Sequence, residues 1–181
     1  MKNAVIIHGT GGRSDLFWFP SVRDALMKKG YEVWVPDMPN TDHPNLAEWI
    51  PFILQRMEFS EDTILIGHSA GSQLILSILE KIDGHIKQAI LVSGYAKALR
   101  LTATDDNDEE PNWNAIKGKA TSMVFVNSDN DPWGCDDTQG RIMFDHLGGT
   151  LVIPKGEGHM GSTTYNQSYE KFPLLVKLLD I

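Results

Sequence analysis

Short apolar runs alternate along the chain with longer stretches whose apolar positions recur every three or four residues. This alternation predicts strands separated by helices, which is typical of α/β proteins with a parallel sheet. Six runs are predicted to be strands: residues 3–8, 31–35, 63–67, 88–93, 122–127 and 150–153. Several of them are apolar at consecutive positions, as expected of strands covered by helices on both faces. The pattern therefore predicts a three-layer α/β/α sandwich with a six-stranded, mostly parallel sheet.

The helices between these strands are marked by apolar stripes and by the residues that end them. Helices are predicted at residues 19–29, 46–57, 70–82, 137–147 and 167–179, with a short further helix at 112–117. Gly30, Gly84 and the glycine pair that begins at Gly148 follow three of these segments, and we expect left-handed caps there. Pro51 removes one backbone hydrogen bond inside the second helix, which predicts a kink or a start near Trp49.

Length, composition and charge narrow the class of protein. The 181 residues, 41% hydrophobic and 22% charged, predict one globular domain over residues 1–181. The formal net charge of −8 argues against nucleic acid or an anionic membrane surface as the main partner. The apolar run at residues 4–7 is too short for a signal peptide or a membrane span, and the single cysteine, Cys135, fits a reducing compartment. We therefore expect a cytoplasmic protein.

Residues 67–71 read Gly-His-Ser-Ala-Gly and join the third predicted strand to a helix. A GxSxG sequence in this position is typical of a nucleophile elbow, a turn so tight that the serine backbone is strained and its neighbours must be glycine. The elbow would expose the Ser69 hydroxyl at the start of a helix, where amide groups favour developing negative charge. This indicates acyl-transfer chemistry, and the alternative is an ordinary strand-to-helix turn built from small residues.

A serine hydroxyl must pass its proton to a base, which is most often histidine. Of the six histidines, His159 is the best candidate, because it lies in a glycine-rich loop directly after the last predicted strand and that loop can bring it over Ser69. His68 is expected to point away from the site as the variable residue of the elbow, and His8 ends the first predicted strand. The alternative for His159 is an ordinary loop histidine.

The base needs a carboxylate that orients it, and this group should come between the serine and the histidine in chain order. Asp129 and Asp131 both follow the fifth predicted strand, at the edge of the sheet where α/β ligand sites form. We prefer Asp131, because Pro132 disfavours helical geometry at that residue and holds the chain extended. Asp129 could equally brace the turn by bonding nearby amides, and either residue could be a simple turn aspartate.

An oxyanion intermediate needs two backbone amides. One should belong to Ala70, the residue after the nucleophile. The other should come from the glycine-rich turn at residues 8–12, through the amide of Thr10 or Gly11, if the first and third strands are adjacent. The turn lacks the GxxxxGK[ST] and GxGxxG patterns, so phosphate binding is a weak alternative.

These segments together resemble the α/β-hydrolase superfamily and, more narrowly, the small serine hydrolases of the retinoblastoma-binding-protein type, also described as YdeN-like. The resemblance covers nearly the whole chain and rests on residues 8–12, 36–39, 49–52, 67–71, 91–93, 128–132 and 158–159. It implies a minimal α/β-hydrolase fold that lacks the first two strands of larger hydrolases, little or no lid, and a triad of Ser69, Asp131 and His159. The acidic insertion near residues 102–111 departs from the family pattern.

The expected reaction is hydrolysis of small carboxylic esters or thioesters through an acyl-enzyme, with the amides of Thr10 and Ala70 holding the oxyanion. Apolar residues in or near the loops at the carboxyl end of the sheet predict an acyl pocket; they are Trp18, Tyr95, Trp133 and Met160. Core packing is the alternative for Trp18. The expected partner is a small acyl substrate, with no metal and no cofactor.

Two other functions fit the same residues. Acyl transfer to an acceptor other than water would use the same serine, histidine and aspartate. A non-catalytic protein-interaction module could also use this scaffold, because a fold does not by itself imply an activity. Cys135 lies four residues after Asp131 and is expected to be inert, because no histidine is predicted to serve it.

Overall fold

All six predicted strands are present in the computed structural model, which describes residues 2–96 and 110–180. They are β1 (Asn3–Ile7), β2 (Glu32–Trp34), β3 (Ile64–His68), β4 (Ile86–Val92), β5 (Ala120–Val126) and β6 (Thr150–Val152). The strands form one sheet in the order β2-β1-β3-β4-β5-β6, and every neighbouring pair is parallel. The predicted acidic insertion at residues 102–111 lies largely outside the described residues.

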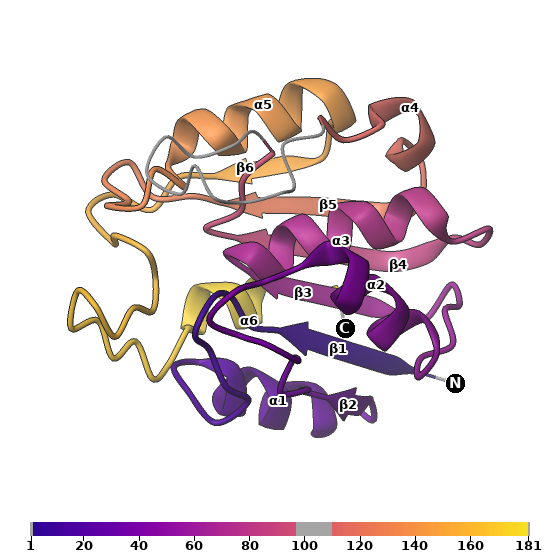
Figure 1. Ribbon diagram of the computed structural model, residues 1–181, viewed down its shortest axis with the longest axis horizontal. Coiled ribbons are helices and arrows are strands. Elements are labelled where there is room, and N and C mark those ends of the chain that lie inside the picture. The colour runs from indigo at the N-terminus through magenta and orange to yellow at the C-terminus, as the bar shows by residue number, and fades with distance from the viewer. Residues whose placement is uncertain (1, 97–109, 181) are drawn as a thin grey trace.

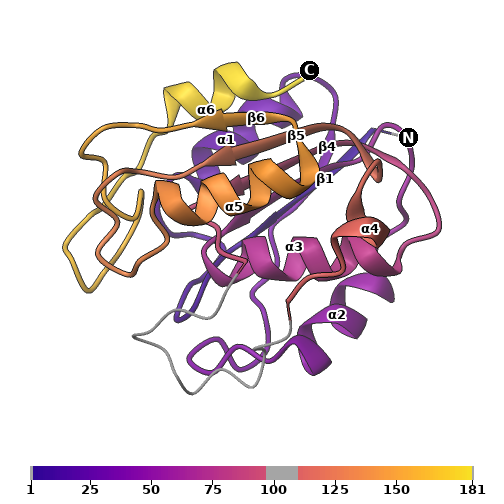
Figure 2. The same cartoon turned by 90° about the horizontal axis from the view of Figure 1, so that it is seen from above.

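Helices cover both faces of this sheet (Figures 1 and 2). They are α1 (Phe19–Met27), α2 (Leu46–Leu54), α3 (Ala70–Lys81), α4 (Trp113–Ile116), α5 (Asp137–Leu147) and α6 (Pro173–Leu178). In Figure 2, α1 and α6 lie on one face, and the other four helices lie on the opposite face. The predicted three-layer sandwich is thus confirmed.

Alternate residues of the central strands supply the two cores that hold these layers together. Val5, Leu65 and Phe125 belong to the core under α2, α3 and α5. Ile6 and Ile66 belong to the core under α1 and α6. All five side chains are fully buried, because a strand covered on both faces must be apolar at consecutive positions. Burial of this kind is the main force that stabilises the sheet.

Three predictions about the helices need correction. Helix α6 begins at Pro173 and not at residue 167, because Ser162 and Gln167 form an antiparallel bridge that holds the preceding segment as a loop. Gly84 does not adopt the predicted left-handed conformation, since α3 ends earlier at an extended residue. Helix α2 begins at Leu46 and continues through Pro51, so the alternative start near residue 49 is wrong.

The strand order places the functional loops next to one another. From β1 the chain adds β2 on one side and β3 on the other, so the order reverses between β1 and β3. The carboxyl ends of parallel strands at such a reversal form the usual ligand crevice of α/β proteins. The elbow follows β3 at this point, and the glycine-rich turn at residues 8–12 follows β1. Among the described residues, no helix is long and apolar enough to cross a membrane.

Candidate active site

The nucleophile elbow has the strained geometry that its sequence predicts. Ser69 has φ 55° and ψ −121°, a backbone conformation that residues other than glycine rarely adopt. A Cβ atom at Gly67 would lie 2.6 Å from the carbonyl oxygen of Gly71, and a Cβ atom at Gly71 would overlap the carbonyl oxygen of Ile7. Both glycines are therefore required for α3 to pass so close to β1 and β3. The turn leaves Ser69 partly exposed.

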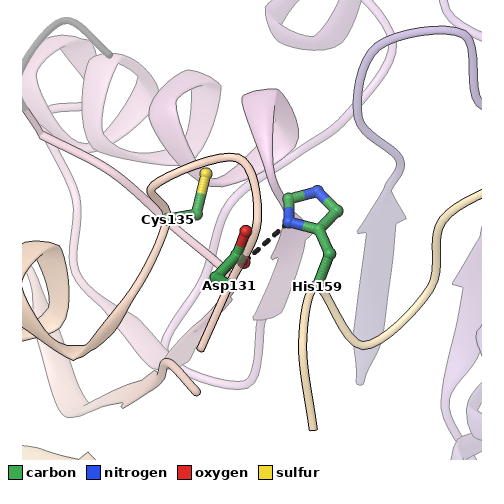
Figure 3. A group of neighbouring side chains, drawn as sticks. All are labelled: Asp131, Cys135 and His159. Atoms are coloured by element: carbon green, nitrogen blue, oxygen red, sulfur yellow. Dashed lines mark hydrogen bonds and ion pairs between the residues drawn. The ribbon is translucent and has the colours of Figure 1, made fainter. Parts of the chain in front are cut away.

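Asp131 and His159 form the central polar pair of the site (Figure 3). The Nδ1 atom of His159 lies 2.7 Å from Oδ2 of Asp131, and both side chains are buried. The other carboxylate oxygen of Asp131 accepts a hydrogen bond from the amide of Trp133 at 2.9 Å. This arrangement fixes the carboxylate, and it directs the remaining ring nitrogen of His159 away from Asp131. Asp129 does not share this contact.

Four consecutive residues after β5 bind four consecutive residues after β6. Besides the Asp131–His159 pair, three side-chain oxygens of the first segment accept hydrogen bonds from backbone amides of the second: Asp129 from Gly156 at 2.7 Å, Ser128 from Glu157 at 3.0 Å and Asn130 from Gly158 at 2.8 Å. We call residues 128–131 the docking strip. Because β5 and β6 are neighbours, the strip lies beside the histidine loop and holds it against the site. Asp129 thus binds the histidine loop.

The backbone carbonyl of His159 accepts hydrogen bonds from the elbow and from the residue after β4. His68 Nε2 donates to this oxygen at 2.8 Å, and the Ser93 hydroxyl donates to it at 3.0 Å. The indole of Trp18 donates to the next carbonyl, that of Met160, at 2.9 Å. His68 was expected to point away from the site, but its ring lies 4.8 Å from that of His159, between centroids, and its hydrogen bond connects the elbow directly to the histidine loop. Sequence reasoning missed this role.

His68 holds this position as a neutral ring. It is packed among the rings of Phe17, Trp18 and Phe19. Burial, followed by the repulsion of His159, lowers the pKa of His68 to about 3. A neutral imidazole carries one N–H, and the contact with the His159 carbonyl assigns it to Nε2, because a carbonyl oxygen can only accept.

The turn after β1 comes close enough to the elbow to supply an oxyanion amide. A Cβ atom at Gly9 would lie 2.7 Å from Cβ of Ser69 and 3.2 Å from its hydroxyl oxygen. The amide of Gly11 donates to the carbonyl of Thr41 at 2.7 Å and is therefore engaged elsewhere. Of the two alternatives, this leaves the amide of Thr10. Ala70 is the first residue of α3, so its amide has no acceptor within the helix.

The His8 ring stabilises this turn through two hydrogen bonds. Its Nδ1 donates to the carbonyl of Gly9 at 2.8 Å, and its Nε2 accepts from the amide of Met38 at 3.0 Å. Burial lowers the pKa of His8, which favours the neutral ring that these two bonds require. The carboxylate of Asp37 also binds the amide of Ser14, at 2.6 Å. The segment after β2 thus fixes the turn that follows β1.

The predicted acyl-pocket residues fall into two groups. Trp18 and Met160 have no exposed surface and belong to the core beneath α1 and α6, so the prediction that they contact substrate is wrong in this structure. Tyr95 is also nearly buried, against Cys135. Trp133 is partly exposed, and its ring lies 6.4 Å from that of His159, between centroids. Tyr165, which the sequence analysis did not single out, contacts Trp133 and is 46% exposed.

Cys135 lies in the site, contrary to the expectation that no histidine would be near it. Figure 3 shows its side chain beside Asp131 and His159. Its sulfur, a carboxylate oxygen of Asp131 and a ring nitrogen of His159 all lie within 4.8 Å of one another. Burial, and then the charges of Asp131 and Asp136, raise the pKa of the thiol, while an interaction with the Ser69 side chain acts in the opposite direction. At neutral pH the group is therefore a thiol and a poor nucleophile.

Comparison with known proteins gives consistent matches across most of the chain. A sequence model of the family described as "Serine hydrolase" matches residues 4–180. The YdeN protein of Bacillus subtilis strain 168 is 36% identical over 101 residues, which make up 54% of this chain and 53% of that protein. Serine hydrolase RBBP9 of Rattus norvegicus is 26% identical over 175 residues, which make up 91% of this chain and 90% of that protein.

Solved structures show the same fold. The crystal structure of the ydeN gene product from B. subtilis gives a TM-score of 0.89 at 24% identity and covers 98% of this chain and 96% of that one. Est1E from Butyrivibrio proteoclasticus, solved with ferulic acid bound, gives a TM-score of 0.73 at 16% identity, with 98% of this chain and 86% of that one covered.

Proposed function

Because the chain belongs to the serine hydrolase family and has the fold of YdeN- and RBBP9-like α/β hydrolases, we propose that it hydrolyses small carboxylic esters or thioesters with Ser69 as the nucleophile. The observation that carries the proposal is the buried 2.7 Å contact between Asp131 and His159, in a site whose serine sits on a strained elbow. A histidine oriented by a carboxylate is the base that a serine nucleophile requires.

In the proposed reaction, His159 removes the proton of Ser69 as the hydroxyl attacks the acyl carbon. Asp131 keeps the Nδ1–H tautomer in place and stabilises the imidazolium that forms. The histidine then passes this proton to the leaving alcohol or thiol, which departs and leaves an acyl-enzyme. A water molecule, deprotonated by the same histidine, attacks the acyl group and releases the acid and the free serine.

The amides of Thr10 and Ala70 are proposed to bind the oxyanion of each tetrahedral intermediate. Gly9 supports this role, because only a residue without a side chain allows the turn to approach Ser69 so closely. A pre-positioned donor of this kind contributes about 3–4 kcal/mol to transition-state stabilisation. His8 supports that positioning through its bond to Gly9 in the turn, and Asp37 binds Ser14, just after the turn.

The proposed substrate is a small acyl ester whose acyl or alcohol group contacts Trp133 and Tyr165. The Trp133 ring lies near that of His159, the Tyr165 ring contacts Trp133, and both rings are at least partly exposed. Est1E, which shares the fold, was solved with a carboxylic acid, ferulic acid, bound, and a carboxylic acid is one product of the proposed reaction. We also propose a cytoplasmic location, which the unpaired Cys135 favours.

The test is turnover of a panel of acyl esters, thioesters and amides by the intact chain and by two serine variants. Ser69→Ala is expected to lower kcat by a factor on the order of 10⁶. Ser77→Ala is the matched control, because that hydroxyl lies on the same helix and donates to the carbonyl of Gln73, one turn earlier. Equal turnover by Ser69→Ala and the control would exclude the proposal. Added alcohols and amines distinguish transfer from hydrolysis, because an acyltransferase would form their acyl products in preference to the free acid.

A further inference from the structure

Cys135 adds to the site a metal-binding side chain that the proposed hydrolase reaction does not use. Among residues 2–96 and 110–180, one group brings together three side chains that commonly bind metal ions. These are Asp131, Cys135 and His159, and all three are buried. Their donor atoms lie within 4.8 Å of one another. They come from two loops that the docking strip holds together, so the donors are fixed relative to each other before any ion binds.

The chemistry of these donors selects a class of cation. A thiolate, an imidazole and a carboxylate together are typical ligands of Zn²⁺ and of similar borderline-soft ions, whereas Mg²⁺ and Ca²⁺ prefer oxygen alone. Zinc bonds of about 2.0–2.3 Å in a tetrahedron place neighbouring donors roughly 3.3–3.7 Å apart. Binding would therefore draw donors that lie up to 4.8 Å apart together by about 1 Å and would widen the 2.7 Å contact between Asp131 and His159 by a similar amount.

Charge balance also favours a divalent ion in this buried place. One thiolate and one carboxylate cancel the two positive charges of the ion, and the imidazole binds as a neutral ring. The thiol proton is released to solvent, and the single imidazole proton resides on the ring nitrogen that does not contact the metal. A metal can displace a thiol proton even where burial disfavours the free thiolate.

From this geometry we propose that Asp131, Cys135 and His159 form a binding site for Zn²⁺ and similar ions, and that occupation of the site reversibly inhibits the enzyme. We expect the ion to enter past Ser69, because this residue is partly exposed and interacts with Cys135. The fourth ligand is the Ser69 hydroxyl or a water molecule. With the ion bound, His159 no longer accepts the serine proton, and Asp131 no longer orients the histidine ring. The inhibition rests on the proposed hydrolase function, whereas metal binding does not.

Binding is tested first, without turnover, by titrating the intact chain with Co²⁺ as a spectroscopic substitute for Zn²⁺. We expect one equivalent to bind and to produce the near-ultraviolet charge-transfer band of a cobalt–thiolate bond. Since Cys135 is the one cysteine of the chain, this band identifies the ligand even if every variant unfolds. Saturation without a thiolate band, or no binding at all, would overturn the site.

Variants then assign the ligand. Cys135→Ser and Cys135→Ala should abolish the band and weaken Zn²⁺ binding by at least 10- to 100-fold, which is the loss already seen when an outer partner of a metal ligand is removed. His43→Gln is the matched control, because His43 is an exposed histidine outside the group of three donors, and this variant should bind Zn²⁺ as the intact chain does. Equal binding by the cysteine variants and the control would contradict the proposal.

The last experiment measures inhibition of ester hydrolysis by metal ions, with the rate of each variant compared to its own rate without metal. Zn²⁺ should inhibit ester hydrolysis by the intact chain, a chelator should restore it, and Mg²⁺ should have no effect. The inhibition constant should rise at least 10- to 100-fold in Cys135→Ser. Inhibition that persists unchanged in that variant would refute regulation through this site. If the chain binds Co²⁺ through sulfur but hydrolyses no ester, the result would support the metal site and contradict the proposed hydrolase function.

Discussion

At Asp131, each carboxylate oxygen has its own partner, one the His159 ring and the other the Trp133 amide. Asp131→Asn should lower kcat by a factor on the order of 10⁴, because an amide no longer holds the Nδ1–H tautomer of the histidine. Asp129→Asn keeps an oxygen that accepts from the Gly156 amide, so its loss should stay below about tenfold. Steady-state kinetics on the two variants make the comparison. A larger loss in Asp129→Asn would reassign the acid.

His68 is expected to position His159 without contacting substrate. His68→Gln retains an N–H that can donate to the His159 carbonyl, whereas His68→Phe retains the ring shape and loses the donor. The hydrogen bond contributes about 0.5–1.5 kcal/mol, so kcat should be roughly 2- to 10-fold lower in the phenylalanine variant than in the glutamine variant, with similar KM values. Equal kcat values in the two variants would show that the bond has no positioning role.

Local patterns in the sequence located some of these residues and missed others. Ser69 and His159 stand out because each has a glycine within two residues on both sides, in a segment that follows a predicted strand. The role of His68 depends on a contact across 91 positions, and the Trp18–Met160 bond spans 142. Nothing near either residue in the chain indicates such a partner. For the same reason, Trp18 was expected at the pocket and is found in the core.

At the scale of elements, close packing of α3 against β1 depends on Gly71. Gly71→Ala should lower the free energy of unfolding by at least about 1–3 kcal/mol, because its Cβ atom would overlap the Ile7 carbonyl and force the backbones apart. Gly84→Ala is the control, since a Cβ atom there meets nothing within 4 Å and φ is not left-handed. That change should leave stability unaltered or raise it by up to about 1 kcal/mol.

Urea denaturation of the two glycine variants measures both effects. Equal stabilities would mean that the strand and helix can separate at no energetic expense, which would contradict the account of the elbow. The expected order holds whichever substrate the protein acts on, so this measurement tests the fold alone.

Strands and most helices were predictable because their apolar periodicity follows directly from burial on one or two sides. The start of α6 was not, because the bridge between Ser162 and Gln167 and the left-handed residues Asn166 and Tyr169 hold the preceding segment as a loop. Such backbone conformations leave no periodic signal in the sequence. Boundaries of this kind depend on tertiary contacts, whereas the existence of the elements does not.

At the scale of the whole molecule, buried neutral histidines make stability depend on pH. The pKa of His68 falls to about 3 in the folded chain, against about 6.5 for an unfolded histidine. Between these values the unfolded chain binds a proton that the folded chain does not, so acidification favours unfolding. Stability is therefore complete above about pH 6.5 and falls by up to about 1.4 kcal/mol per pH unit below it on account of His68. The lowered pKa of His8 acts in the same direction.

His68→Gln removes this titration and should flatten the decline. Denaturation curves measured between pH 7.5 and 4.5 give the free energy of unfolding as a function of pH. Below about pH 6.5, the slope of this dependence should be smaller in the variant than in the intact chain, by an amount that corresponds to about one proton. Parallel slopes would indicate that His68 takes up a proton in the folded state, against its buried and neutral assignment.

The most direct test of the central claim, that Ser69 is the nucleophile activated by His159, is mass mapping of the adduct formed with a fluorophosphonate. We predict a single adduct on the peptide that contains Ser69, its absence in Ser69→Ala, and much slower formation in His159→Gln. An adduct on another residue, or unchanged labelling of Ser69→Ala, would contradict the account.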